Sequence, residues 1–337
     1  MKRTEVTSRY DKHIKIGHIG PEGQKAMSSK RVVVIGCGAL GTNIANLLAR
    51  GGVGEILLVD RDIVELSNIH RQVLYSEKDI GNPKAETAAR KLIEVNSDIK
   101  VNYLIKDVMS SNISGIVEGY DLIMDGTDNI PVRLLINDYS IKMGVPWIYG
   151  GVLGTGGMVM IITGEGPCLR CLIPELPEQG DVLTCETMGV LNTVPALTAS
   201  VQVTEAFKVL MGKKPMKGLL QFDVWENDFS VHGFKKDPLC LCCGGKEFNY
   251  LDEDNEEQIT VLCDESVQII LPGTSEADLS LIASSLMGIK NLKVNPFRLE
   301  FEAEGKNVTI FRDRRIIIRG TSDKGVARSL YSKYLGL

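Results

Sequence analysis

The sequence predicts an α/β protein with a doubly wound, mostly parallel Rossmann-like sheet, and three observations lead to that prediction. The apolar run 31–35 is the kind of strand that is buried on both faces of a sheet. A glycine-rich turn at 36–41 follows that run and leads into a helical pattern. Strand-like and helix-like segments then alternate along the chain, which is typical of parallel sheets with helices on both faces.

The individual elements follow from their apolar patterns. Segment 13–29 has a helical pattern that Gly17, Gly20 and Pro21 interrupt, and Pro83 is suited to begin a helix. Segment 61–79 is polar and is expected to be a loop, and the glycine-rich segment 150–157 leads from one strand into the next. We expect strands at 31–35, 55–59, 100–105, 120–124, 145–149, 158–162 and 219–225, and helices at 39–50, 83–95, 130–143 and 195–211.

Length and composition place the chain among ordinary globular proteins. Its 337 residues suggest two domains, 44% of the residues are hydrophobic, and 24% are charged. The net charge of −5 argues against broad nucleic-acid binding. The longest apolar region, 190–211, is interrupted by polar residues, and the N-terminus lacks the apolar core of a signal peptide. We therefore expect a cytoplasmic protein that binds neither membranes nor nucleic acid.

A run of acidic residues marks a domain boundary. Segment 249–258 is rich in Asp and Glu, which is typical of a solvated linker. It separates residues 1–248, which carry the glycine-rich turn, from residues 259–337, where alternating stretches at 259–271 and 298–318 accompany helical patterns near 275–288 and 322–335. This C-terminal part is expected to be a small α+β domain, either an interaction module or an appendage that stabilises a dimer.

The glycine-rich turn predicts a nucleotide-phosphate site. Gly36 permits the turn, Gly38 lets a phosphate approach the backbone, and Gly41 lets the helix pack on the strand. The N-terminus of that helix favours an anion. Asp60 follows about 20 residues later, where an acidic residue binds ribose hydroxyls. On these residues alone, a nicotinamide-dependent oxidoreductase is the favoured function.

The residues after Asp60 favour a triphosphate instead. Arg71 lies in the following loop and Lys84 begins the next helical pattern. A triphosphate carries more negative charge than a dinucleotide and is neutralised by Arg, Lys and a metal ion. The alternative is that both are solvated surface cations. A protein that keeps the fold only as a non-catalytic scaffold is a third possibility.

Read together, these residues resemble a known family. The glycine turn, Asp60, Asn68, the Arg71-Gln72 pair, Lys84 and the segment Thr127-Asp128-Asn129 are similar to the motifs of the ThiF/MoeB/HesA family, the prokaryotic relatives of ubiquitin-activating enzymes, over residues 9–247. The resemblance implies an adenylyltransferase that uses Mg·ATP to adenylate the C-terminal glycine of a small ubiquitin-like sulfur-carrier protein with a Gly-Gly tail, for sulfur transfer in cofactor biosynthesis or tRNA thiolation. It also implies a homodimer.

The resemblance also implies roles for individual residues. It implies Asp60 at the ribose, Asn68, Arg71 and Lys84 at the phosphates, and Asp128 near Mg²⁺, with Gln72 and Asn129 in the same nucleotide-binding motifs. Segment 9–13 matches an N-terminal Arg-Tyr-x-Arg pattern in which the second arginine reaches the ATP of the partner subunit. Here Lys12 takes that place, and it supplies charge without a bidentate fork. Arg9 is expected to be structural.

Eight cysteines suggest metal or thiol chemistry, since no secretion signal precedes them. Two C-x-x-C pairs supply four thiolates, which suit a tetrahedral structural zinc. The resemblance implies that the ligands are Cys168, Cys171, Cys240 and Cys243, with Cys242 the ambiguous neighbour. Reduced structural cysteines or a redox pair are the alternatives.

Cys185 stands apart from the two pairs, in a polar segment. The resemblance aligns it with the family's conjugating cysteine, whose thiolate attacks an acyl-adenylate. In some members of the family that cysteine is dispensable. Cys185 is therefore a candidate nucleophile, beside Arg71, Lys84 and Asp128 as the other candidate catalytic residues.

Overall fold

The computed structural model describes residues 9–174, 188–252, 258–262, 266–270, 277–286, 288–289, 291–312 and 314–335. They form two compact units, Met1–Glu253 and Asp254–Leu337 by their bounds, and each has its own sheet. The division lies within the predicted linker 249–258. Within that segment, Asn249–Asp252 forms the short helix α11 and Gln258 begins strand β9.

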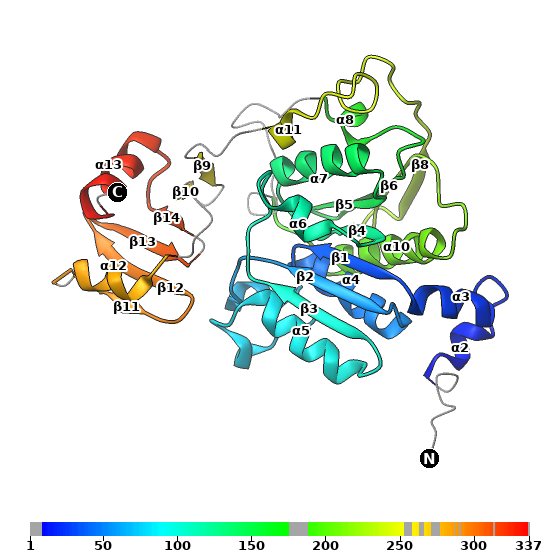
Figure 1. Ribbon diagram of the computed structural model, residues 1–337, viewed down its shortest axis with the longest axis horizontal. Coiled ribbons are helices and arrows are strands. Elements are labelled where there is room, and N and C mark those ends of the chain that lie inside the picture. Colours follow the sequence, from blue (N-terminus) through cyan, green and yellow to red (C-terminus); the bar gives the residue numbers. More distant parts are fainter. Residues whose placement is uncertain are drawn as a thin grey trace. The chain divides into compact units, whose positions relative to one another are not determined.

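The large unit contains an eight-stranded sheet in the order β3-β2-β1-β4-β5-β6-β7-β8 (Figure 1). Its first five strands pair in parallel, as predicted, and the last three pair antiparallel. The parallel strands are β1 (Arg31–Ile35), β2 (Glu55–Val59), β3 (Lys100–Leu104), β4 (Leu122–Asp125) and β5 (Trp147–Leu153). The antiparallel strands are β6 (Gly156–Ile162), β7 (Leu219–Asp223) and β8 (Asp228–His232).

Helices cover both faces of this sheet, and each face has its own apolar core (Figure 1). Alternate residues of β1 point to opposite cores, so both sides of the strand are buried. One core includes α3 (Gly20–Ser28), α4 (Ala39–Gly51), α5 (Lys84–Val95) and α10 (Thr193–Leu210). The other includes α6 (Ile113–Val117), α7 (Ile130–Met143) and α8 (Leu169–Leu172).

The glycine-rich segment 150–157 does not form a separate connection between strands, because most of it lies within β5 and β6. A β-carbon on Gly150 would lie 2.5 Å from Gln202 Nε2, and one on Gly157 would lie 2.3 Å from Phe222 Cζ. Neighbouring side chains occupy the space that a residue with a side chain would need. These glycines are therefore packing positions inside a hairpin. Strand β8 is a separate difference, because no strand was predicted there from the sequence.

A short helix begins the described chain. It is α2 (Asp11–Ile14), and its N-cap residue Tyr10 is buried against Gly52, where a β-carbon would lie 2.4 Å from the tyrosine ring. Asn96 donates to the Tyr10 hydroxyl at 2.7 Å. Arg9 donates to the Val95 carbonyl at 3.0 Å and pairs with Asp98 at 3.1 Å. Arg9 and Tyr10 thus fasten the N-terminus to the end of α5, as expected for a structural Arg9.

The small unit contains both strands and helices. Its sheet has the order β11-β12-β13-β14-β10-β9, and every pairing is antiparallel. The strands are β9 (Gln258–Leu262), β10 (Ser266–Ile270), β11 (Lys293–Val294), β12 (Arg298–Ala303), β13 (Lys306–Phe311) and β14 (Arg315–Arg319), and the helices are α12 (Leu279–Ser285) and α13 (Lys324–Leu335). Cys263 lies outside the described residues.

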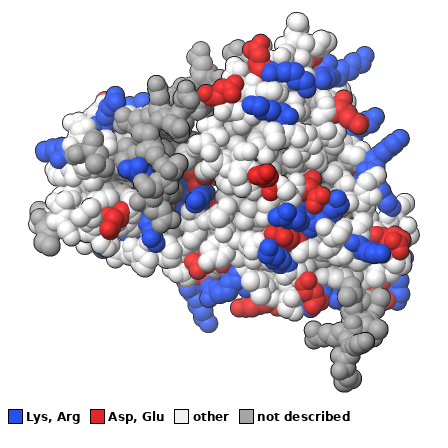
Figure 2. All heavy atoms as spheres, viewed as in Figure 1, with Lys and Arg blue, Asp and Glu red and all other residues white. Residues whose placement is uncertain are grey.

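The surface is mixed in charge. Figure 2 shows Lys and Arg side chains interspersed with Asp and Glu over the face that it draws. Among the helices within the described ranges, none is long and apolar enough to cross a membrane.

Candidate nucleotide and metal sites

The glycine turn joins β1 to α4, and two of its glycines are required by close packing. Gly36 has a φ of +88°, a conformation that favours glycine. A β-carbon on Gly41 would lie 1.8 Å from the Gly36 carbonyl oxygen, so only glycine fits. The turn also packs on the segment after β4, because a β-carbon on Gly126 would lie 2.5 Å from that same oxygen. Three glycines from two strand ends therefore fix the backbone of the loop.

Gly38 differs from these glycines because no neighbour requires it. The nearest atom to a β-carbon at this position would be Gln72 Nε2, 3.9 Å away. Gly38 is the N-cap of α4, a helix with no side-chain cap. The space beside its peptide faces the free N–H groups and the positive end of the helix dipole. The spacing of the glycines predicts a phosphate at this position, and the assignment stays a prediction.

Asp60 lies directly after β2 and holds the glycine turn from the side. Its carboxylate accepts hydrogen bonds from the backbone N–H of Cys37 at 2.5 Å and of Asp62 at 2.7 Å. Burial raises the pKa of Asp60, and the nearby Lys84 ammonium opposes that increase. Asp60 is therefore positioned beside the turn, where a ribose is expected to lie.

The segment after Asp60 forms a short 3₁₀ turn, Leu66–Asn68, instead of an irregular loop. The side chain of Asn68 accepts from the Glu65 N–H at 3.3 Å and so helps cap that turn. The Arg71 side chain contacts residues of its own turn: its Nη1 lies 2.8 Å from both the Ser67 carbonyl and His70 Nε2.

Gln72 is buried beside the glycine turn. Within the described part of the chain, its Oε1 has no hydrogen-bond partner, and its Nε2 lies on the side of Gly38. A buried amide oxygen without a partner is unfavourable unless a ligand or water satisfies it. Gln72 therefore fits a place at the edge of a ligand site.

Lys84 is the first residue of α5 and is buried, and its Nζ lies 3.3 Å from Asp62 Oδ2. Burial alone would lower the pKa of Lys84, but the carboxylates of Asp62, Asp60 and Asp128 raise it above its ordinary value. The ammonium is therefore charged at neutral pH. Lys84 is therefore a buried cation among carboxylates and not a solvated surface lysine.

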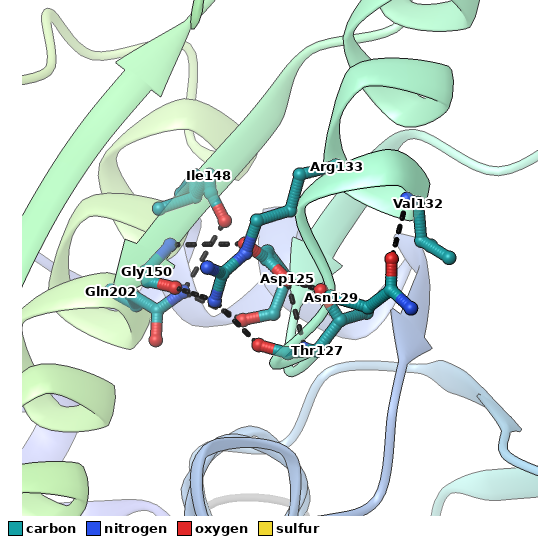
Figure 3. Close-up of polar contacts among 8 residues, drawn as sticks. All are labelled: Asp125, Thr127, Asn129, Val132, Arg133, Ile148, Gly150 and Gln202. Atoms are coloured by element: carbon teal, nitrogen blue, oxygen red, sulfur yellow. Dashed lines mark hydrogen bonds and ion pairs between the residues drawn. The ribbon is translucent and has the colours of Figure 1, made fainter. Parts of the chain in front are cut away.

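The turn after β4 carries Asp128 and is built around a buried ion pair (Figure 3). Asp125 ends β4 and is fully buried, and it accepts from Arg133 Nε at 3.0 Å and from Thr127 N and Oγ1 at 2.9 and 2.8 Å. Arg133 also donates to the Gly150 carbonyl at 2.7 Å. Gln202 donates to the Asp125 carbonyl at 3.0 Å.

Asp128 and Asn129 have different environments in this turn. Asn129 is the N-cap of α7, where its side chain accepts from the Val132 N–H at 3.1 Å (Figure 3). Its part in nucleotide binding stays a prediction. Asp128 is exposed, and among the described residues no hydrogen bond or ion pair engages its carboxylate. A carboxylate that no hydrogen bond holds within the described ranges, close enough to Lys84 to raise the pKa of that lysine, suits a hard cation such as Mg²⁺.

The structure thus brings most of the predicted nucleotide residues to one edge of the sheet. The carboxyl ends of β1, β2 and β4 meet there, where ligands bind in doubly wound folds. Lys12 is on α2, 90% exposed and 3.7 Å from Asp11, so its role toward a second subunit stays a prediction. Cys185 lies outside the described residues. The residues that converge are Gly36, Gly38, Gly41, Asp60, Gln72, Lys84 and Asp128.

The two cysteine pairs converge on one point. The sulfur atoms of Cys168, Cys171, Cys240 and Cys243 all lie within 4.8 Å of one another, with 3.7 Å between Cys168 and Cys240 and 3.4 Å between Cys171 and Cys243. Four thiolates about 2.3 Å from a tetrahedral zinc would be about 3.8 Å apart. The cluster is therefore compatible with a closed zinc site.

Helix α7 contacts both C-x-x-C pairs from one side. Asn137 accepts from the Leu169 N–H at 2.8 Å and donates to the Cys242 sulfur at 3.3 Å. Asp138 pairs with Arg170 at 3.3 Å, in a fully buried position. Cys242 is not one of the four clustered sulfur atoms, and its thiol contacts both Asn137 of α7 and the neighbouring Cys168.

Sequence reasoning missed three residues that shape the nucleotide site: Asp125, Gly126 and Arg133. Asp125 and Gly126 directly follow the apolar part of β4, which was a signal for a buried carboxylate and a close backbone approach. Arg133 had no such signal, because its partner lies in another element.

Fold and site together define a nucleotide-phosphate-binding α/β protein with a separate four-cysteine cluster. Comparison with known proteins narrows this class. Residues 10–242 match the model of the ThiF family, and the chain belongs to that family.

Several characterised relatives are adenylyltransferases. The "Sulfur carrier protein ThiS adenylyltransferase" of Bacillus subtilis is 39% identical over 98% of this chain and 100% of its own length. The "Sulfur carrier protein adenylyltransferase" of Thermus thermophilus is 38% identical, over 71% of this chain and 92% of its own. A structure of E. coli MccB with ATP, 23% identical over 71% of this chain and 75% of its own, has a TM-score of 0.61 and shows the same fold.

Proposed function

We propose that this chain adenylates the C-terminal glycine of a small ubiquitin-like sulfur-carrier protein with Mg·ATP and releases pyrophosphate. The observation that supports it most strongly is the similarity to the Bacillus subtilis enzyme, which extends over the full length of that relative. The family membership argues against a nicotinamide-dependent oxidoreductase.

The reaction suits the residues at the sheet edge. A carboxylate oxygen of the carrier's terminal glycine attacks the α-phosphorus of ATP, the new P–O bond forms, and the bond to the bridging oxygen breaks as pyrophosphate leaves. The attacking group is already ionised, so no general base is needed. Catalysis then depends on positioning and on charge neutralisation.

Each residue has a part in this proposal. The peptides at Gly36, Gly38 and Gly41 line the phosphates, and Asp60 binds the ribose. Asn68, Arg71 and Lys84 neutralise or bind phosphate oxygens, with Gln72 and Asn129 at the edge of the site. A bound Mg²⁺ would supply further neutralisation of the phosphates, and Asp128 is the residue that would hold it.

The four-cysteine cluster is proposed to hold a structural zinc. All four positions would be filled by protein thiolates, so the metal would have no open position for chemistry. It would instead link the two C-x-x-C pairs to each other and hold them against α7. Zinc sites of this kind contribute about 10 kcal/mol or more to folding.

Two further expectations belong to the same proposal. The chain acts as a cytoplasmic homodimer in which Lys12 reaches the nucleotide of the partner subunit. Cys185 is the nucleophile of a second step, in which its thiolate attacks the carbonyl of the acyl-adenylate, a C–S bond forms and AMP leaves. Thiamine, molybdopterin and tRNA thiolation pathways all use carriers of this chemistry.

Intact-mass analysis of the carrier tests the proposal. The carrier incubated with the enzyme and Mg·ATP should gain the mass of an adenylyl group, which is AMP less one water, and a carrier lacking its terminal glycine should not. Replacing ATP with NAD should give no modification and no thermal stabilisation of the enzyme. A carrier with an intact Gly-Gly tail that stays unmodified under these conditions contradicts the proposal.

A further inference from the structure

The Asp125–Arg133 pair occupies a position that couples three elements of the nucleotide site (Figure 3). Asp125 ends β4, Arg133 lies in the first turn of α7, and Gly150 belongs to β5. The Arg133 guanidinium donates to Asp125 at 3.0 Å, to the Thr127 carbonyl at 2.5 Å and to the Gly150 carbonyl at 2.7 Å. One side chain thus ties the turn after β4 to its own helix and to the neighbouring strand.

That turn carries Asp128, the residue proposed to hold Mg²⁺ at the nucleotide site. Asp128 follows Thr127 directly, and no hydrogen bond fixes its carboxylate in the described structure. Its location depends on the backbone of 126–128. That backbone is held by Arg133 and Asp125 on one side and by the contact of Gly126 with the glycine turn on the other.

We propose that Arg133 is a positioning residue for metal-dependent nucleotide binding. It contacts neither nucleotide nor metal, and acts by fixing the Thr127 carbonyl and so the place of the Asp128 carboxylate relative to the glycine turn. This inference rests on the proposed Mg·ATP site and extends it to a residue that carries no ligand. Two separate nitrogens of the planar guanidinium, Nε and Nη2, donate to the three acceptors, and the single ammonium nitrogen of lysine cannot reproduce that geometry.

The competing explanation is that Arg133 serves only to neutralise buried Asp125. Removing one partner of a buried ion pair destabilises a protein wherever the pair lies. Lysine keeps that charge and loses the fork, so Arg133→Lys separates the two roles. Lys208→Gln is a matched control, because Lys208 pairs at 2.5 Å with Glu205, a buried carboxylate on α10 away from the turn.

Calorimetric titration of the full chain with ATP, in Mg²⁺ and in EDTA, tests the proposal without requiring a carrier. The wild-type protein should bind Mg·ATP more tightly than metal-free ATP. Arg133→Lys should lose about tenfold or more of that metal-dependent gain, as for residues that orient metal ligands. Its affinity for metal-free ATP should stay within about twofold of wild type. Lys208→Gln should keep the full gain.

A double variant and a milder variant complete the test. Asp128→Asn should lose the same gain, and Arg133→Lys combined with Asp128→Asn should lose no more than either alone, because both act through one carboxylate. If Arg133→Lys fails to fold, Thr127→Val removes the 2.8 Å hydroxyl contact to Asp125 and should shift the gain in the same direction.

The outcomes decide between the explanations. A metal-dependent gain that Arg133→Lys and Thr127→Val leave intact overturns the positioning role, and so do additive losses in the double variant. A wild-type protein without any metal preference overturns it too. A protein that binds Mg·ATP as described and accepts no carrier contradicts the proposed function alone.

Discussion

The carbonyl oxygen of Gly36 and the peptide of Gly126 are in direct contact: a β-carbon on Gly126 would lie only 2.5 Å from that oxygen. The first residue belongs to the turn after β1, and the second follows the neighbouring strand β4. The phosphate turn is therefore supported by a second loop, which also carries the candidate metal ligand Asp128. The proposed nucleotide and magnesium sites therefore share one backbone contact.

Alanine substitutions should separate the glycines that support the fold from the glycine that faces the ligand. Gly126→Ala forces the two loops apart and should lower the free energy of unfolding by about 1–3 kcal/mol. Gly38→Ala has room, with its nearest neighbour at 3.9 Å, but alanine is a poorer N-cap than glycine, so it should lower the free energy of unfolding by less than about 1 kcal/mol. It should still weaken ATP binding by at least tenfold, because the added methyl group would occupy the proposed phosphate space and disturb a charge-assisted hydrogen bond worth about 1.5–3 kcal/mol.

Denaturant unfolding and ATP titration measure these two effects. Gly115→Ala is the control, because that glycine lies in α6 with no atom within 4 Å of a β-carbon. It should leave ATP affinity unchanged and raise the free energy of unfolding by about 0.5–1 kcal/mol, as alanine does in place of a helical glycine. Normal ATP affinity in Gly38→Ala would contradict the assignment of the phosphate position.

Lys84 should keep its charge across the working pH range. Burial would lower the pKa of Lys84, but Asp62, Asp60 and Asp128 raise it above the ordinary lysine value. A raised folded pKa stabilises the fold fully below the unfolded pKa of about 10.4, and that contribution disappears only as the pH rises through the higher folded value.

ATP affinity should therefore not fall between pH 7 and about pH 9.5 through loss of this charge. Lys84→Met should weaken ATP binding equally at both ends of that range, and titration at several pH values measures it. Wild-type affinity that declines across this range, while the decline is absent in Lys84→Met, would show that Lys84 loses its proton there.

Protonation of Asp79 should contribute to the loss of stability at acidic pH. Burial alone would raise its pKa, but hydrogen bonds from Lys91 and from Ser76 lower it below the ordinary aspartate value. A lowered folded pKa stabilises the protein above the unfolded pKa of about 3.9, and this contribution is lost as the pH falls through the folded value.

Asp79→Asn should cost about 1–3 kcal/mol of unfolding free energy at pH 7. The difference from wild type should shrink as the pH falls below about 4. Urea unfolding of both proteins across this range provides the measurement. A difference that is the same at pH 3 and pH 7 would be inconsistent with an ionised, hydrogen-bonded Asp79.

Metal analysis should give one zinc per chain, held without Cys242. Cys240→Ser should lose the metal and much of the thermal stability, because the ligand set is incomplete. Cys242→Ala should retain the metal and lose only about 1–3 kcal/mol, since the Asn137 amide loses its acceptor. Elemental analysis with thermal unfolding decides this, and loss of zinc in Cys242→Ala would place Cys242 in the ligand set.

Local patterns predicted the parallel half of the sheet well, because buried strands and glycine turns have short-range signals. Strands β1 and β2 and the start of α5 lie where the sequence indicated. The glycines in β5 and β6 gave no such short-range signal and predicted a connecting segment instead. Glycine is required there because the side chains of Gln202 and Phe222, from distant parts of the sequence, pack over these positions.

The sequence predicted those residues of the candidate site whose type and spacing in a local motif indicate one chemical role. Gly36, Gly41, Asp60 and Lys84 are of this kind. Arg133 was not, because its acceptors at Asp125, Thr127 and Gly150 come together only when α7 and β5 pack beside the end of β4.

ATP–pyrophosphate exchange is the most direct measurement of the central claim. The enzyme with Mg·ATP and a sulfur carrier ending in Gly-Gly should incorporate labelled pyrophosphate into ATP, because carrier adenylation is reversible. The exchange should stop without the carrier, and with a carrier that lacks its last glycine. Absence of exchange with every Gly-Gly carrier of the same genome, in an enzyme that binds Mg·ATP, would contradict the account.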